Sequence, residues 1–279
     1  MTVAILSGKG GTGKTFLSVN LAAAAEQAVY IDCDVEEPNG RLFLRPREVR
    51  QQAVTTPLPA FDGVRCDGCR RCVDFCRFHA LVYVKGKPMV FPDVCHACGG
   101  CALVCPQGAV REEARTVGTV ETGIRDGIQV VTGILNTGEA SAVPVIRAAL
   151  AAGLGQEDTT IIDCPPGSSC SVMESVEKAD YCVLVTEPTA FGLHNLRMVQ
   201  ELVTLLGKPW GVVLNKAEGD YPPLEQFLKE TGGTILASIP FSPELAALGA
   251  GGKLACRRSP EFKALLQGLL TRLREECGA

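Results

Sequence analysis

A glycine-rich loop near the N-terminus has the composition of a phosphate-binding site. Residues 8–15 fit the pattern G-x-x-x-x-G-K-[ST], between an apolar run at 3–7 and a helical stretch at 14–26. Glycines let backbone N–H groups wrap around a phosphate, and the start of the following helix adds positive potential. Lys14 would bring a charge to the β- and γ-phosphates, and the Thr15 hydroxyl would ligate Mg²⁺. The residues expected to bind the nucleotide here are Gly8, Gly10, Gly11, Thr12, Gly13, Lys14 and Thr15.

Eight of the cysteines lie between positions 66 and 105, in two runs of identical spacing. Each run is C-x₂-C-x₂-C-x₃-C, which is the cysteine pattern of bacterial ferredoxins. Three thiolates in a tight loop face three iron corners of a [4Fe–4S] cube, and the fourth leads away to the other cluster. The spacing therefore predicts two clusters, one held by Cys66, Cys69, Cys72 and Cys105 and the other by Cys95, Cys98, Cys101 and Cys76.

Zinc and disulfides are the alternatives for a chain with 14 cysteines. A zinc ribbon requires only paired C-x₂-C units, so two complete four-cysteine runs favour iron–sulfur clusters. Disulfides are not expected, because the chain opens on an apolar strand without a basic leader and the cytosol keeps thiols reduced. We therefore expect a cytoplasmic protein. One departure from the ferredoxin pattern is Arg77, which follows Cys76 where proline is usual.

The composition indicates a soluble globular protein. Of 279 residues, 46% are hydrophobic and 21% are charged, which suits one large domain with a small insert. The net charge of −4 predicts no affinity for nucleic acid. No apolar run reaches the roughly 18 residues of a membrane span. A helix expected at 260–276 has an apolar face suited to core packing, so no membrane anchor is expected.

Short apolar runs separated by helical stretches predict an α/β fold. Strands without polar alternation are typical of a mostly parallel sheet covered by helices on both faces. They are expected at 3–7, 29–31, 159–162, 181–186, 210–214 and 234–239, with a hairpin of 117–124 and 128–134. The pattern stops near 55–59 and resumes after the cysteines. The expected organisation is a nucleotide-binding domain in two parts, 1–60 and 111–279, with a small ferredoxin-like α+β domain inserted at 61–110.

The glycine-rich loop contains a second lysine, Lys9, and reads Gly-Lys-Gly-Gly-Thr-Gly-Lys-Thr. It resembles the deviant Walker A motif of the MinD/ParA and nitrogenase-iron-protein family of P-loop ATPases, and the resemblance covers the chain outside the cysteine segment. It implies that Lys9 reaches into the nucleotide site of a second subunit and neutralises transition-state charge, as an arginine finger does. The resemblance therefore implies a P-loop NTPase fold and ATP hydrolysis by a homodimer that forms on ATP binding.

Carboxylates that follow two of the expected strands match the switch regions of that family. The sequence Asp-Cys-Asp-Val-Glu-Glu-Pro-Asn begins at Asp32, and Asp-Cys-Pro-Pro-Gly begins at Asp163. The resemblance implies that Asp34 orients or activates the attacking water and that Asp32 assists near Mg²⁺. It also implies that Asp163 holds Mg²⁺ through water and that the Gly167 N–H senses the γ-phosphate. Carboxylates at strand ends are alternatively simple helix caps.

Two further positions resemble the base site of the family. Asn215 matches its adenine-reading asparagine, and Pro240 lies where a loop closes the base pocket. Cys170 stands seven residues after Asp163, where the nitrogenase iron protein has one ligand of its bridging cluster. The other ligand of that protein has no match in residues 134–138. We therefore expect Cys170 to be a thiol of the switch region and not a cluster ligand.

Three functions fit these motifs. ATP-gated electron transfer to an unidentified redox partner is favoured, because clusters in a hydrolase without redox chemistry otherwise lack a purpose. An iron–sulfur cluster assembly or carrier ATPase, with an iron–sulfur protein as its partner, is the first alternative. It resembles the Mrp-type scaffolds, although their C-terminal C-x-x-C does not occur here. A positioning ATPase of the MinD/ParA type is the second alternative.

Overall fold

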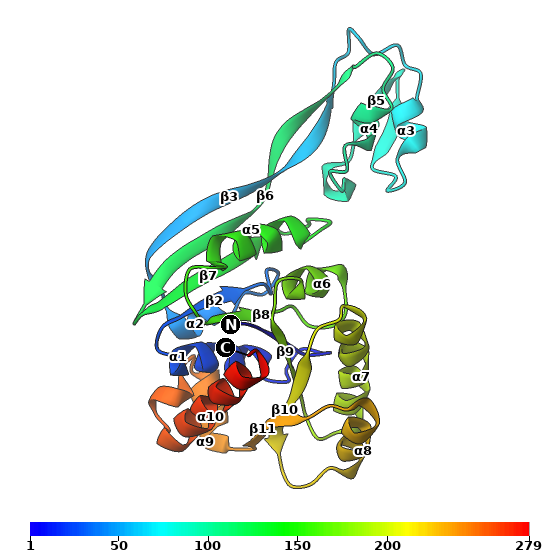
Figure 1. The fold of residues 1–279 in the computed structure, drawn as a ribbon. Helices are drawn as coiled ribbons and strands as arrows, with labels where there is room; N and C mark the ends of the chain where they lie inside the picture. The colour runs from blue at the N-terminus through cyan, green and yellow to red at the C-terminus, as the bar shows by residue number, and fades with distance from the viewer. Residues whose placement is uncertain (279) are drawn as a thin grey trace.

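The computed structural model describes residues 1–278, which form a sheet-based body and a projecting arm (Figure 1). One sheet has nine strands. Their order is β11 (Ile235–Pro240), β10 (Trp210–Ala217), β9 (Tyr181–Thr186), β1 (Thr2–Leu6), β8 (Thr160–Asp163), β2 (Ala28–Asp32), β7 (Ile128–Leu135), β6 (Val110–Arg125) and β3 (Arg47–Phe61). All neighbours from β11 to β7 are parallel, whereas β6 is antiparallel to both β7 and β3. The predicted α/β fold with a mostly parallel sheet is confirmed.

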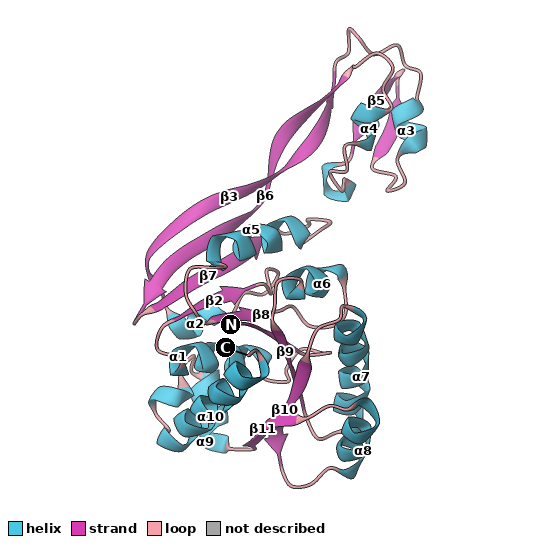
Figure 2. Ribbon diagram, in the orientation of Figure 1, coloured by secondary structure: helices cyan, strands magenta, loops and turns pink. Residues whose placement is uncertain are grey.

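Helices cover both faces of the sheet and enclose two hydrophobic cores (Figure 2). One face carries α5 (Val143–Gly153), α6 (Cys170–Val176), α7 (Ala190–Leu205) and α8 (Pro222–Thr231). The other carries α1 (Lys14–Ala24), α2 (Gly40–Leu44), α9 (Pro243–Ala250), the 3₁₀ helix η2 (Ala255–Arg257) and α10 (Pro260–Glu276). Successive side chains of a strand point to opposite faces, so Ala4 and Leu6 of β1 enter the first core and Val3 and Ile5 the second. Among residues 1–278, no helix has the length and apolar character needed to cross a membrane.

The arm is made of β3 and β6, which run on together far beyond the body (Figure 1). β3 has 15 residues and β6 has 16, and a strand of this length spans about 50 Å at roughly 3.3 Å per residue. Residues 62–109, here called the cysteine module, lie at the outer end of the arm. They contain a hairpin of β4 (Leu81–Val84) and β5 (Lys87–Val90) and three short helices, α3 (Arg71–Phe75), η1 (Pro92–Val94) and α4 (Gly100–Leu103).

The arm differs from the sequence-based expectation. β3 continues through the segment 55–59, where the pattern was expected to stop, and β6 begins seven residues before position 117. This part of the strand was not predicted because Pro57 and Pro59 interrupt the pattern expected of a strand. They are tolerated because β3 is the edge strand, and alternate residues direct their missing N–H groups to the same, unpaired side. The expected β6–β7 hairpin is confirmed, with Arg125 paired to Ile128.

The arm leaves the body at an irregularity in the β3–β6 pairing. Val54 pairs with Gly118 while Thr55 pairs with Thr116, so Val117 is an extra residue on β6. A β-bulge of this kind bends its strand and increases the local twist. The bulge therefore sets the direction in which the arm carries the cysteine module.

Gly118→Ala should lower the free energy of unfolding by about 1–3 kcal/mol, the usual cost of overpacking a tight interior. A Cβ at this position would lie 2.4 Å from the Ile134 carbonyl oxygen and 2.6 Å from Cγ2 of Val145. Urea denaturation followed by circular dichroism measures the change. Gly268→Ala is the control, because a Cβ there on α10 meets nothing within 4 Å and should stabilise the helix by up to about 1 kcal/mol. Unchanged stability of Gly118→Ala would contradict this packing.

Candidate functional site

Lys14 is the first residue of α1 and stands at the end of the glycine-rich loop that follows β1. Its Nζ donates to Asp163 Oδ1 at 2.7 Å and lies 3.7 Å from Asp34 Oδ2. The Lys14 side chain is 6% exposed, and that of Asp163 is fully buried. The parallel strands β1, β8 and β2 are neighbours, so their carboxyl ends bring the loop, Asp163 and Asp32 to one edge of the sheet. The structure thus places the loop lysine among the predicted carboxylates.

Asp32 is fully buried at the end of β2 and accepts two backbone hydrogen bonds. The Asp34 N–H donates to its Oδ1 at 3.2 Å, and the Gly40 N–H donates to its Oδ2 at 2.9 Å. Burial and the charge of Asp163 raise the pKa of Asp32 well above its ordinary value. Burial alone would lower the pKa of Lys14, but the carboxylates of Asp163, Asp34 and Asp32 outweigh it and raise that pKa. Lys14 is therefore held as a cation whose present partners are carboxylates.

The loop itself fits an oxygen-rich anion. A Cβ on Gly10 or Gly11 would meet nothing within 4 Å, so the backbone on this side is open. Gly11 and Gly13 have φ values of 79° and 89°, which glycine adopts without the strain of a side chain. The Thr12 hydroxyl is buried and has no hydrogen-bond partner among residues 1–278. A buried hydroxyl without a partner is costly, and a phosphate oxygen would provide one.

An apolar hollow of about 240 Å³ adjoins the loop at Gly13. The structure places the two predicted base-site residues, Asn215 and Pro240, in its wall. The Asn215 Nδ2 donates to the Thr12 carbonyl at 2.7 Å, so in this structure the amide braces the phosphate loop. The aromatic rings of Phe16 and Phe43 complete the hollow. Sequence reasoning missed both rings, because apolar positions next to a motif look the same as core positions.

The predicted switch regions face each other across a second cleft. Residues 33–39 and 165–171 contribute most of its walls, and its volume is about 540 Å³. The Gly167 N–H, predicted to sense the γ-phosphate, donates instead to the Ser7 carbonyl at 2.9 Å. A γ-phosphate could accept from Gly167 only after this hydrogen bond breaks. The φ of 92° at Gly167 shows that the turn itself depends on glycine.

Lys9 is held by its own chain in this structure. Its Nζ lies 3.1 Å from Glu187 Oε2 and 5.1 Å from the centroid of the Phe191 ring. The other Glu187 oxygen lies 2.6 Å from Lys216 Nζ. Burial opposes the ionisation of Glu187, but hydrogen bonds from Lys216 and Lys9 hold its pKa below the ordinary value. Lys9 must leave Glu187 before it can reach a second subunit, and no sequence motif pointed to this carboxylate.

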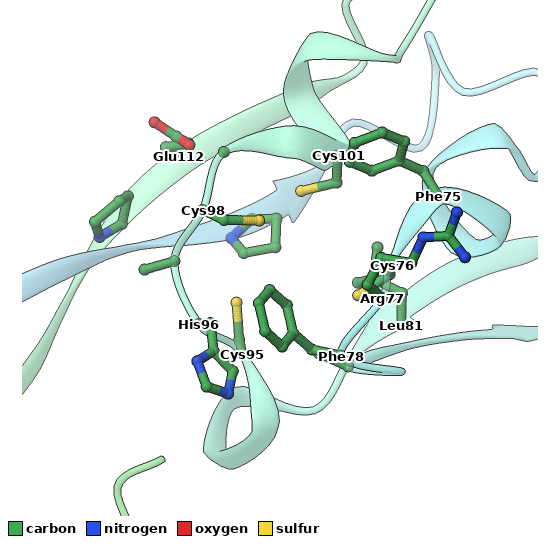
Figure 3. Close-up of a pocket in the computed structure, with 15 residues that line it drawn as sticks. Phe75, Cys76, Arg77, Phe78, Leu81, Cys95, His96, Cys98, Cys101 and Glu112 are labelled. Carbon is green, nitrogen blue, oxygen red and sulfur yellow. The ribbon is translucent and has the colours of Figure 1, made fainter. Parts of the chain in front are cut away.

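The eight cysteines of the module surround two separate hollows. The inner hollow is lined by Cys76, Cys95, Cys98 and Cys101, and the outer hollow by Cys66, Cys69, Cys72 and Cys105. Figure 3 shows the inner one: the sulfur atoms of Cys95, Cys98 and Cys101 point into it, and Cys76 faces them from the other side. These groups have the same members as the two predicted ligand sets. What they hold stays a prediction.

The donor sets suit a cluster better than a single ion. In residues 1–278, no three His, Cys, Asp or Glu side chains lie close enough together to hold one metal ion. A [4Fe–4S] cluster takes one thiolate at each iron corner of a cube, so its ligands stand further apart than those around one ion. Four thiols around each hollow fit that requirement. His96, beside Cys95, stacks on Phe78 with ring centroids 4.0 Å apart, so its ring is already engaged.

Comparison with known families identifies the domain. The CobQ/CobB/MinD/ParA nucleotide binding domain matches residues 3–255. The chain belongs to this family. The predicted resemblance to MinD/ParA proteins is confirmed at this level, and so is the P-loop NTPase fold. That the loop around Lys14 binds the nucleotide stays a prediction.

Relatives of this CobQ/CobB/MinD/ParA protein include an uncharacterized protein of Methanocaldococcus jannaschii, 28% identical over 282 residues, which covers 99% of this chain and 97% of its own length. An iron-sulfur cluster carrier protein of the same organism is 22% identical over 299 residues, 97% of this chain and 84% of its own. The septum site-determining protein MinD of Pyrococcus horikoshii, solved with Mg-ADP, has a TM-score of 0.60 at 20% identity and covers 98% of this chain and 96% of its own. MinD of Pyrococcus furiosus, a cell division ATPase, scores 0.59 at 20% identity with 98% of both chains covered. These structures show the shared fold.

Lys14→Ala should weaken ATP binding by about 10- to 100-fold, because hydrogen bonds to a charged group are worth roughly 1.5–3 kcal/mol. Isothermal titration calorimetry with Mg-ATP measures the change, and thermal unfolding checks that the variant folds. Lys9→Ala is the matched control and should keep its affinity, since Lys9 contacts Glu187 and not the loop interior. Equal affinities for Lys14→Ala and the unmodified protein would show that the nucleotide lies elsewhere.

Proposed function

We propose that this protein hydrolyses ATP as a homodimer and that its nucleotide state controls electron exchange between two [4Fe–4S] clusters and a redox partner. One observation carries the proposal: two hollows ringed by four thiols stand at the end of an arm whose strands belong to the nucleotide-binding sheet. When bound, each cluster would take up and release one electron. Separate hollows on a shared sheet would let one conformational change act on both.

The nucleotide half of the proposal follows from the partners of Lys14. Entering phosphates would draw its Nζ from Asp163 and Asp34, because the β- and γ-phosphates carry more charge than either carboxylate. Asp163 and the Thr15 hydroxyl would then hold Mg²⁺, whose preferred ligands are oxygens and water. Asp34, freed from the lysine, would orient the attacking water. Lys9, released from Glu187, would neutralise charge in the site of the second subunit.

Screening weakens a direct electrical influence of the nucleotide on the clusters. The projecting part of the arm, residues 55–61 paired with 110–116, spans about 23 Å at roughly 3.3 Å per residue, whereas charges in physiological salt are screened within about 8–10 Å. We therefore propose a mechanical connection that starts at Val35. Its carbonyl accepts from the Leu135 N–H at 2.9 Å, and a Cβ on Gly133 would lie 2.6 Å from its Cγ1. A shift of the first switch therefore presses on β7, the strand that pairs with the arm strand β6.

Iron–sulfur cluster delivery is the second candidate. The similarity to a protein named as an iron-sulfur cluster carrier spans almost the whole chain. Cys69 and Cys98 are exposed, one at each hollow, so a receiving protein could approach both sites. Delivery predicts that iron and sulfide leave the protein on incubation with an apo-acceptor, whereas electron transfer predicts that they stay. A positioning ATPase would show neither behaviour.

Protein purified without oxygen should be brown and contain about eight iron and eight acid-labile sulfide per chain. Cys76→Ser should damage the cluster of the inner hollow, because Cys76 lies there with three cysteines of the second run. Cys105→Ser should damage the cluster of the outer hollow, because Cys105 lies there with three cysteines of the first run. Cys182→Ser, a change in the sheet core, is the control and should keep all the iron. Iron and sulfide analysis with EPR of the reduced protein reads the outcome. Stoichiometric zinc, or only four iron per chain, would refute the two-cluster assignment.

ATP should change the EPR line shape of the reduced protein and the rate at which it reduces an acceptor dye. Asp34→Ala should bind ATP, lose hydrolysis and hold the ATP form of the spectrum. Lys9→Ala should bind ATP without the spectral change, because the dimer would not close. Titrations with ATP, ADP and a non-hydrolysable analogue supply the comparison. If no nucleotide alters the spectrum or the rate, gated electron transfer is wrong, and transfer of iron to an apo-protein would favour the carrier function.

A further inference from the structure

Arg115 joins the cysteine module to the body of the protein. It lies on β6, inside the arm, and its guanidinium contacts carboxylates in both directions. Nη2 donates to Asp93 Oδ1 at 2.9 Å in η1 of the module. Nη1 donates to Glu139 Oε2 at 2.6 Å in the loop between β7 and α5. Asp93 is two residues from Cys95, so this bridge holds the edge of the inner hollow toward the body.

The two ion pairs of Arg115 differ in their exposure to solvent. The Glu139 side chain is 7% exposed and that of Arg115 23%, so this pair is shielded from solvent and salt. The Asp93 side chain is 76% exposed. Exposed ion pairs are weak, whereas shielded, short, charge-assisted hydrogen bonds are stronger. Arg115 is thus anchored to the body by Glu139, and its contact with Asp93 is the one that opens easily.

The bridge stands beside the bulge at Val117 where the arm bends. Asn136 holds this bulge with two hydrogen bonds: its backbone N–H donates to the Val117 carbonyl at 2.9 Å, and its Nδ2 donates to the Thr116 carbonyl at 3.1 Å. The preceding residue, Leu135, is the one whose N–H donates to Val35 of the first switch. A continuous hydrogen-bonded path therefore runs from the switch to the base of the arm.

We infer that the bulge at Val117 is the hinge of the arm and that Arg115 is a positioning residue that latches the cysteine module to the body. This inference rests on the proposed function, because the signal that moves the arm is the binding of ATP. Movement of Val35 displaces Leu135 and Asn136, which turns the bulge and swings the arm. Arg115 stands two residues from the hinge and moves little, whereas Asp93 moves with the module, so the exposed Arg115–Asp93 contact breaks and the Arg115–Glu139 contact is kept. The inner hollow is held against the body in one state and turned to a partner in the other.

Amide hydrogen exchange of the full-length, iron-loaded protein tests the latch. The amides of Val94 and Cys95 donate to the carbonyl groups of Phe91 and Pro92 across η1, so their exchange reports how firmly this turn is held. Arg115→Ala should speed exchange of residues 91–98 by about twofold to fivefold, the range expected for loss of one exposed ion pair. The non-hydrolysable ATP analogue should speed it similarly in the unmodified protein and add nothing in Arg115→Ala.

Matched variants separate the latch from a general loss of charge. Arg111→Ala, on the same strand but without an ion pair within residues 1–278, should leave exchange unchanged. Asp93→Asn should act like Arg115→Ala, the double variant should add nothing, and Asp93→Glu should restore protection. If the exchange rate of residues 91–98 is unchanged in Arg115→Ala, the latch is wrong. The same holds if the bound ATP analogue leaves that rate unchanged in the unmodified protein. An exchange response without any nucleotide effect on electron transfer supports the latch and refutes only the proposed function.

Discussion

One buried cation organises the candidate nucleotide site. Lys14 lies where β1, β8 and β2 end, and its ammonium group faces the carboxyl groups of Asp163 and Asp34 in the interior. Removing one member of such a group leaves an uncompensated buried charge, which costs about 3–5 kcal/mol. The same arrangement makes the site responsive. A phosphate that takes Lys14 changes the partners of the carboxylates at once, and each carboxylate begins a loop that leads to another part of the molecule.

The loop that begins at Asp32 leads to the arm. Its backbone is fixed at two places, by Asp34 and Gly40 N–H groups that donate to Asp32 and by the Val35 carbonyl that accepts from β7. The chain then passes through α2 directly into β3. The loop is therefore connected to the arm in two ways. The chain continues from it into β3, and its hydrogen bond to β7 links it to β6, the neighbour of β7. Solvent and salt screen an electric field along such an arm. A small rotation at its base nevertheless becomes a large displacement at its tip.

The sequence predicted which site residues lie together better than it predicted the connection between the two groups. Motifs for phosphate and for iron–sulfur clusters have fixed spacings because these groups impose their own geometry, so the loop at 8–15 and the two cysteine runs were readable without a structure. The strand β3 was missed because Pro57 and Pro59 break the local pattern, and only its edge position explains why they are tolerated. Glu187 and Arg115 were missed because an ion pair between distant segments leaves no local signal. Their roles depend on the tertiary structure alone.

The thiols of the chain fall into two populations with different chemistry. Cys33, Cys164 and Cys182 are fully buried among the strands, and burial raises the pKa of each, that of Cys182 to about 12. The thiolate is the form that binds metal ions, so the protonated core thiols would not compete with the cysteine module for iron. A sheet covered on both faces requires such burial, whereas a site that exchanges electrons or clusters with a partner requires access to solvent. Burial in the sheet and access for a partner cannot both be met at one place in a small body. An arm that continues two strands of the sheet exposes the cysteine module and still connects it to the nucleotide-binding domain.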